Sequence, residues 1–174
     1  MRGVVCLMAL MLAIGVSACA PMGDVYDYVG RSGTVQKPNE VVDAVDWDQA
    51  LVFQVDIRQD EFRPAIVHLF QGEPYIMVIE NRDDVSHLFS APAFFRTTAI
   101  RKLVTEKEEI SGINIVALDL APGEIKEVHF VPVRDGTYDF EGGEGPGFFM
   151  TGSVTSPLSR GAREGMVGIF VVEQ

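Results

Sequence analysis

The sequence predicts an all-β fold, a single antiparallel β-sandwich with one short helix, and three observations support this. Short segments either alternate apolar with polar residues or are apolar throughout, which is typical of strands. Turn-forming residues such as Gly, Pro and Asp separate these segments. The chain has 174 residues, 47% hydrophobic and 22% charged, which suits one domain with a real core and a short leader.

The predicted strands begin at residue 51. In LVFQVDI (51–57) every second residue is apolar, so one face of this strand is expected to be buried. PYIMVIEN (74–81) is apolar on both faces from Tyr75 to Ile79, as expected of a central strand. The other predicted strands are AIVHLF (65–70), NIVALDL (114–120), IKEVHFVPV (125–133), TYDFE (137–141) and MVGIFVVE (166–173).

The helical candidate is SAPAFFRTTAIRK (90–102), with Ser90 as its cap and Pro92 in its first turn. Residues 40–50 fit either a short helix or an edge segment. Residues 20–39 are interrupted by glycines and prolines and predict a tether. The histidines His68 and His129 lie in predicted strands and are expected to be structural, with His129 facing water beside Glu127.

The N-terminus predicts a secretory signal. Arg2 precedes an apolar run of 13 residues without a charge, Val4 to Val16, which is too short to span a bilayer as a helix, and small residues end it. The sequence Val-Ser-Ala-Cys (16–19) resembles the lipobox of bacterial lipoproteins, which implies lipidation of Cys19. The expected organisation is a lipoprotein signal peptide (1–18), a lipidated N-terminus and tether (19–44) and one domain (45–174). Ala20 after Cys19 implies an outer-membrane location, facing the periplasm, in a Gram-negative host. A plain signal peptide with an incidental cysteine is the alternative.

Composition narrows the function classes. Cys6 lies in the signal and Cys19 would carry lipid, so the mature domain has no free thiol and no disulfide. The net charge is −11, and removal of Arg2 with the signal leaves −12, which disfavours nucleic acid as a partner. Membrane attachment is therefore expected through the lipid. The sequence has no nucleophile, phosphate-loop or zinc motif, and the acidic pair Asp83-Asp84 is predicted to lie in a turn. We expect a protein that is not an enzyme.

Several segments in order resemble the cupredoxins, the blue-copper β-sandwich proteins. FRPAIVHLFQGEPYIMVIEN resembles their first hairpin, and NRDDVSHLF places His87 where the family has its first copper histidine. LAPGEIKEVHFVPVRDGTYDFE resembles the strands that lead to the copper loop, and GMVGIFVVE resembles the last ligand methionine with the closing strand. The resemblance implies a Greek-key sandwich over residues 45–174.

The departures from the family concern the metal site. A blue site uses two histidines, a cysteine thiolate and an axial methionine. The region where the resemblance places the cysteine reads Glu141-Gly142-Gly143, and Phe148 stands where the second histidine is expected. His87 and Met166 remain, and Met150 in the inserted loop offers a second sulfur. The resemblance therefore implies a non-blue copper site with His87, Met166 and Met150 as candidate ligands. The alternatives are a relic histidine and methionines that fill the core or a loop.

Two functions remain open. The first is an envelope lipoprotein that binds or passes on copper, its cofactor, without the cysteine ligand. The second is a metal-free cupredoxin-fold module whose 142–165 loop binds a protein partner in an envelope or respiratory assembly.

Overall fold

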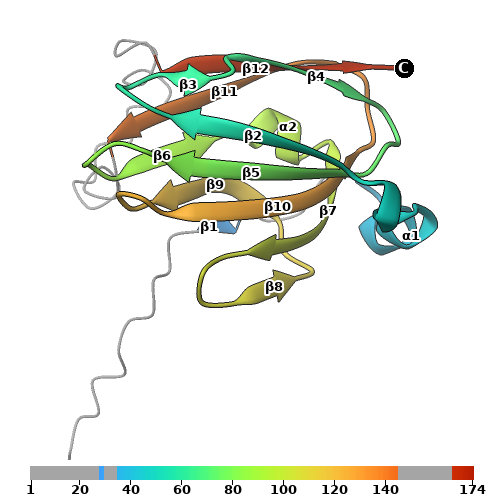
Figure 1. The fold of residues 1–174 in the computed structure, drawn as a ribbon. Helices are drawn as coiled ribbons and strands as arrows, with labels where there is room; N and C mark the ends of the chain where they lie inside the picture. Colours follow the sequence, from blue (N-terminus) through green and yellow to red (C-terminus); the bar gives the residue numbers. More distant parts are fainter. Residues whose placement is uncertain (1–27, 30–34, 145–165) are drawn as a thin grey trace, which may run out of the picture.

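The computed structural model describes residues 28–29, 35–144 and 166–174, which form two β-sheets packed face to face (Figure 1). In spatial order the first sheet contains β1 (Tyr28–Val29), β9 (Ile115–Leu120), β6 (His87–Ser90), β11 (Gly136–Glu144), β12 (Val167–Glu173) and β4 (Ile66–Phe70). The second contains β3 (Phe62–Arg63), β2 (Leu51–Ile57), β5 (Tyr75–Asn81), β10 (Ile125–Pro132), β7 (Thr98–Val104) and β8 (Glu109–Ser111).

The predicted all-β sandwich is confirmed, and six predicted strands match β2, β4, β5, β9, β10 and β12 to within two residues. Most strand pairs are antiparallel as predicted, but β2 pairs with β5 and β4 pairs with β12 in parallel. Between β2 and β5 the chain forms the short strand β3, antiparallel to β2, and then crosses to the first sheet as β4.

The core lies between the sheets and is rich in phenylalanine. Phe94 stacks on Phe170 with ring centroids 4.3 Å apart, and Phe140 lies 4.6 Å from Phe170. Side chains from both sheets complete this cluster, among them Val55, Ile57, Leu69, Met77, Ile79, Phe89, Leu118, Leu120, Val128 and Phe130. Edge-to-face and offset aromatic pairs of this kind stabilise a core beyond the area they bury.

The helix predicted over residues 90–102 is reduced to one turn, α2 (Pro92–Phe95), whose Phe94 and Phe95 enter the core. Pro92 opens this turn as predicted, but Ser90 is not its cap, because Ser90 pairs with Ala117 and Glu141 in the first sheet and Ala91 precedes the helix. From Thr98 the chain is strand β7, hydrogen-bonded to β10 and β8, and this pairing outweighs the local helical tendency.

Residues 40–50, left open between helix and edge segment, lie in the helix α1 (Pro38–Ala44) and the 3-10 turn η1 (Trp47–Gln49). Val42 of α1 packs on Ala99 and Val131, on the outer face of the second sheet. The range predicted as tether, 19–44, thus contains a helix that contacts the sandwich. No helix among the described residues is long and apolar enough to cross a membrane. The predicted signal and Cys19 lie outside the described residues.

Candidate metal centre

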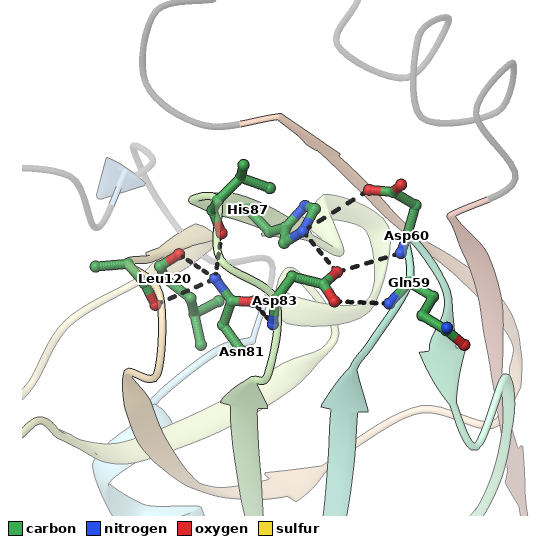
Figure 2. A network of polar contacts seen from close by, with 8 residues as sticks. Gln59, Asp60, Asn81, Asp83, His87 and Leu120 are labelled. Atoms are coloured by element: carbon green, nitrogen blue, oxygen red, sulfur yellow. Dashed lines mark hydrogen bonds and ion pairs between the residues drawn. The ribbon is translucent and has the colours of Figure 1, made fainter.

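Three polar side chains meet at the end of the sandwich where β2 and β5 finish (Figures 1 and 2). Because these strands are parallel with Ile57 opposite Asn81, the turns that follow them emerge side by side. Asp60 lies in the turn after β2 and Asp83 in the turn after β5. His87 opens β6 in the facing sheet. One ligand atom from each of Asp60, Asp83 and His87 lies within 4.8 Å of the others.

Asp83 is held by backbone donors. Its Oδ1 accepts the Gln59 N–H at 2.7 Å and its Oδ2 accepts the Asp60 N–H at 3.2 Å. Gln59 and Asp60 adopt the left-handed conformation, with φ of 55° and 57°, which turns both amides toward the carboxylate. Burial alone would raise the pKa of Asp83, but these two donors together with His87 outweigh it and lower the pKa. Asp83 is therefore a fixed, ionised acceptor at neutral pH.

Asn81 fixes the turn that carries Asp83. Its side chain is fully buried, and the two N–H groups of its Nδ2 are shared among the carbonyls of Val85, Leu120 and Ala121, at 2.8, 2.9 and 3.1 Å. Its Oδ1 accepts the Asp83 N–H at 3.0 Å. Since Leu120 belongs to the first sheet and Asn81 to the second, this amide joins the two sheets directly beneath the site (Figure 2).

His87 is fully buried, and its two ring nitrogens have different surroundings. Nε2 lies 3.0 Å from Oδ2 of Asp83 and 3.8 Å from Oδ1 of Asp60. Nδ1 is buried and has no hydrogen-bond partner in the described part of the chain. An ionised carboxylate accepts but does not donate, so a neutral His87 carries its proton on Nε2. That tautomer leaves the lone pair on Nδ1.

The surroundings of His87 fit a metal ligand. Histidines that bind metals donate their other ring N–H to a carboxylate or carbonyl, which fixes the tautomer and the ring orientation. The contact from Nε2 to Asp83 supplies this second interaction, and Nδ1 is the nitrogen left for a metal. Binding through Nε2 instead would leave an unpaired N–H buried at Nδ1, which is unfavourable. The carboxylate of Asp60 is the most exposed of the three and brings a further negative charge to the same end.

Comparison with solved structures shows which fold this is. A multicopper oxidase of the hyperthermophile Aquifex aeolicus superposes on 75% of the chain with a TM-score of 0.51 and 11% identity. One of Pseudomonas thermotolerans superposes on 74% with a TM-score of 0.50 and 14% identity. The chain has a cupredoxin-like fold. It spans 31% of the length of each oxidase. A mutant amicyanin in its oxidized state covers 75% of the chain at 17% identity, with a TM-score of 0.39 over 88% of its own length. No family of known sequences and no curated protein matches the chain.

The cupredoxin-like fold brings together two regions that the sequence analysis had linked to the metal. Met166 is buried, and its carbonyl accepts the Gly142 N–H at 2.9 Å. A Cβ added at Gly142 would lie 2.5 Å from Cε of Met166, so the methionine side chain fills the space beside this glycine. Met166 belongs to the main core cluster, which agrees with core filling, while its role as a ligand stays a prediction. Met150 and residues 145–165 lie outside the described residues.

Sequence reasoning missed Asp60 and placed Asp83 only in a turn. The available signal was that both follow the ends of predicted strands, but parallel pairing of those strands was not foreseen. The expectation that His129 faces water is wrong: its ring lies 6.1 Å from that of Trp47, which covers it, and only 8% of the residue is exposed. His68 is a surface residue paired with Glu173.

Proposed function

We propose that this cupredoxin-like protein binds copper at a non-blue site and that Nδ1 of His87 is the anchoring ligand. The observation that carries the proposal is a fully buried imidazole whose Nε2 is held by Asp83 while Nδ1 has no partner among the described residues. The imidazole nitrogen suits Cu(II), whereas the softer Cu(I) prefers sulfur. The expected state is therefore Cu(II).

The chain's own residues define what such a site does. Asp83 orients the imidazole, and Asn81 holds the turn in place before any metal arrives. Gly142 offers no thiolate on the strand beside β6. Bound copper would therefore lack the strong copper–sulfur bond behind the blue colour and rapid electron transfer. The role that fits is to hold copper or pass it on, without catalysis.

The cellular setting of the proposal comes from the N-terminal sequence. The signal-like segment ending at Cys19 supports a lipid-anchored protein of the cell envelope that faces the periplasm. A periplasmic copper carrier or recipient is then the expected class of partner. The acidic net charge of −11 disfavours nucleic acid.

Copper titration of the full chain in mild detergent tests the proposal. We expect one Cu(II) per chain, with electron paramagnetic resonance showing nitrogen coupling and no intense blue absorption. His87→Gln should abolish this binding, since glutamine still donates to Asp83 but has no Nδ1. His68→Gln is the matched control, because His68 lies exposed on a strand, and it should bind as the wild type does. Urea unfolding of each variant verifies that it is folded.

Two results would overturn the proposal. Equal Cu(II) affinity in the His87→Gln and wild-type proteins would exclude His87 as a ligand. Absence of any binding by the wild type would leave the metal-free module as the better hypothesis. That alternative rests on the 142–165 loop, most of which lies outside the described residues, and it stays a prediction.

A further inference from the structure

The outer face of the second sheet carries a separate structure built around Trp47. Residues 35–50, which include α1 and η1, lie across β7 and β10, and we name this segment the N-terminal clasp. The Trp47 indole lies over His129 of β10, with ring centroids 6.1 Å apart, and the guanidinium carbon of Arg101 is 4.5 Å from the Trp47 ring centroid. The indole N–H donates to the Val42 carbonyl at 2.8 Å, which joins the ring to α1.

The clasp is attached by side-chain packing. Every hydrogen bond recorded for residues 35–50 among the described residues stays inside the clasp, such as those from Lys37 to Glu40 and from Asp48 to Asp46. Its recorded contacts with the sandwich, among the described residues, are apolar and aromatic. Val42 clusters with Ala99 and Val131, the indole lies against His129 and Arg101, and further clasp valines pack against the cluster: Val35, Val41 and Val45. This small cluster is separate from the main core. The clasp can therefore detach without breaking the sheets.

His129 is poorly placed to carry a charge while the clasp is closed. Its side chain is 11% exposed, and its Nδ1 is buried without a hydrogen-bond partner in the described part of the structure. Nε2 lies 3.4 Å from Oε2 of Glu127, a long contact. A neutral ring leaves one nitrogen unpaired, but an imidazolium would bury an unpaired N–H donor together with its charge, which is far less favourable.

The charges around His129 come from three strands. Glu127 on β10 favours the imidazolium. Arg101 and Lys102 on β7 oppose it, and Lys102 is the register partner of His129. Glu109 on β8 is paired with Lys102 at 2.8 Å, while the partner on β5 is the apolar Ile76. Burial is the largest effect and lowers the pKa of His129, Glu127 counteracts it, and the two cations add to it.

We propose that His129 is a pH-sensitive latch: its neutral ring keeps the N-terminal clasp closed on the sandwich, and its protonation in mildly acidic medium opens the clasp while the sandwich stays folded. An open clasp returns the ring to water, where its pKa is close to the ordinary value of about 6.5. The open form then binds the proton more tightly than the closed form. By linkage, the ratio of open to closed clasp rises as pH falls below about 6.5, by at most about tenfold per pH unit.

The latch has a built-in reporter, because Trp47 is the single tryptophan of the chain. Its fluorescence in the full chain is to be followed from pH 7.5 to 5, alongside hydrogen exchange of residues 35–50 and of β5. We expect red-shifted emission and faster exchange of the clasp at low pH, with β5 still protected. His129→Phe and His129→Gln are neutral at every pH and should remove this dependence, whereas the exposed-strand control His68→Gln should keep it.

The outcomes decide the proposal clearly. A pH-dependent red shift that persists unchanged in both His129 variants assigns the effect to another group and overturns the latch. Simultaneous loss of protection in β5 and the clasp means that acid unfolds the whole domain, which also overturns it. The latch is also overturned if neither the emission nor the hydrogen exchange changes between pH 7.5 and 5. None of these readouts requires copper, so failure of the latch leaves the copper proposal unaffected.

Discussion

Replacing Asp83 by asparagine removes the charge on which the candidate metal centre depends. The carboxylate has contacts with the Gln59 and Asp60 amides and with Nε2 of His87, at 2.7, 3.2 and 3.0 Å, and only 14% of the side chain is exposed. Hydrogen bonds to a charged group contribute about 1.5–3 kcal/mol each. Asparagine keeps one acceptor oxygen, but its NH₂ group faces N–H donors with which it cannot form a hydrogen bond. We therefore expect the free energy of unfolding to fall by about 3 kcal/mol.

The same substitution should affect copper through the imidazole tautomer. If the asparagine amide faces Nε2 of His87, that nitrogen becomes the acceptor and the proton moves to Nδ1. Nδ1 then lacks the lone pair that a metal needs, and loss of such a supporting residue lowers metal affinity by about 10–100-fold. Copper titration against a competing chelator measures this effect, and urea unfolding measures stability.

Asp84→Asn is the matched control for Asp83→Asn. Asp84 is the next residue, is exposed and has no recorded partner among the described residues, so this variant should unfold and bind copper as the wild type does. The reasoning is refuted if Asp83→Asn and Asp84→Asn have the same unfolding midpoint and the same copper affinity. If Asp83→Asn lowers stability but not copper affinity, Asp83 has a structural role only and does not support a metal site.

Three further substitutions, one of them with a control variant, test the surrounding structure. Gly142→Ala should lower the unfolding free energy by about 1–3 kcal/mol through overpacking. Gly143→Ala, whose Cβ would meet no other described residue within 4 Å, should change it little by that mechanism in urea titrations. Asn81→Ala leaves three carbonyls without their donor and should cost about 3–5 kcal/mol by the same assay. Burial, with a smaller effect from Asp139, raises the pKa of Glu141, so the folded state binds its proton more tightly. Glu141→Gln should then stabilise the protein at pH 7 but not below about pH 4 in thermal melts, and no gain at pH 7 would contradict this.

The sequence was sufficient to predict most of the fold, because alternation is a local signal. The two-residue period of β2 and the apolar run of β5 were enough to predict where these two strands begin and end. The apolar run also predicts that β5 is a central strand. Strand β6 escaped prediction because all four of its residues are buried, which leaves no alternation to detect. The predicted helix overlaps strand β7, because Ser90 and Pro92 are typical of a helix start and a true helical turn, α2, lies just before the strand.

The candidate site was only partly predictable, because its geometry depends on contacts between distant residues. His87 was found from its resemblance to a copper ligand. Asp60 was not found, since it reaches His87 only through the parallel pairing of β2 with β5. The burial of His129 has a similar origin, because Trp47, which covers it, is 82 positions away in the chain. Local patterns carry no information about such contacts.

Gly142 limits how this domain can change by single substitutions. The resemblance places the cysteine of a blue-copper site in the segment 141–143, where a Cβ added at Gly142 would touch the core. A cysteine there would meet Cε of Met166 at 2.5 Å and Cζ of Phe62 at 2.8 Å from its Cβ alone. Both side chains would have to repack before a sulfur atom fits. Gly142→Cys is therefore expected to make the protein less stable, and it would still lack the second histidine of a blue-copper site.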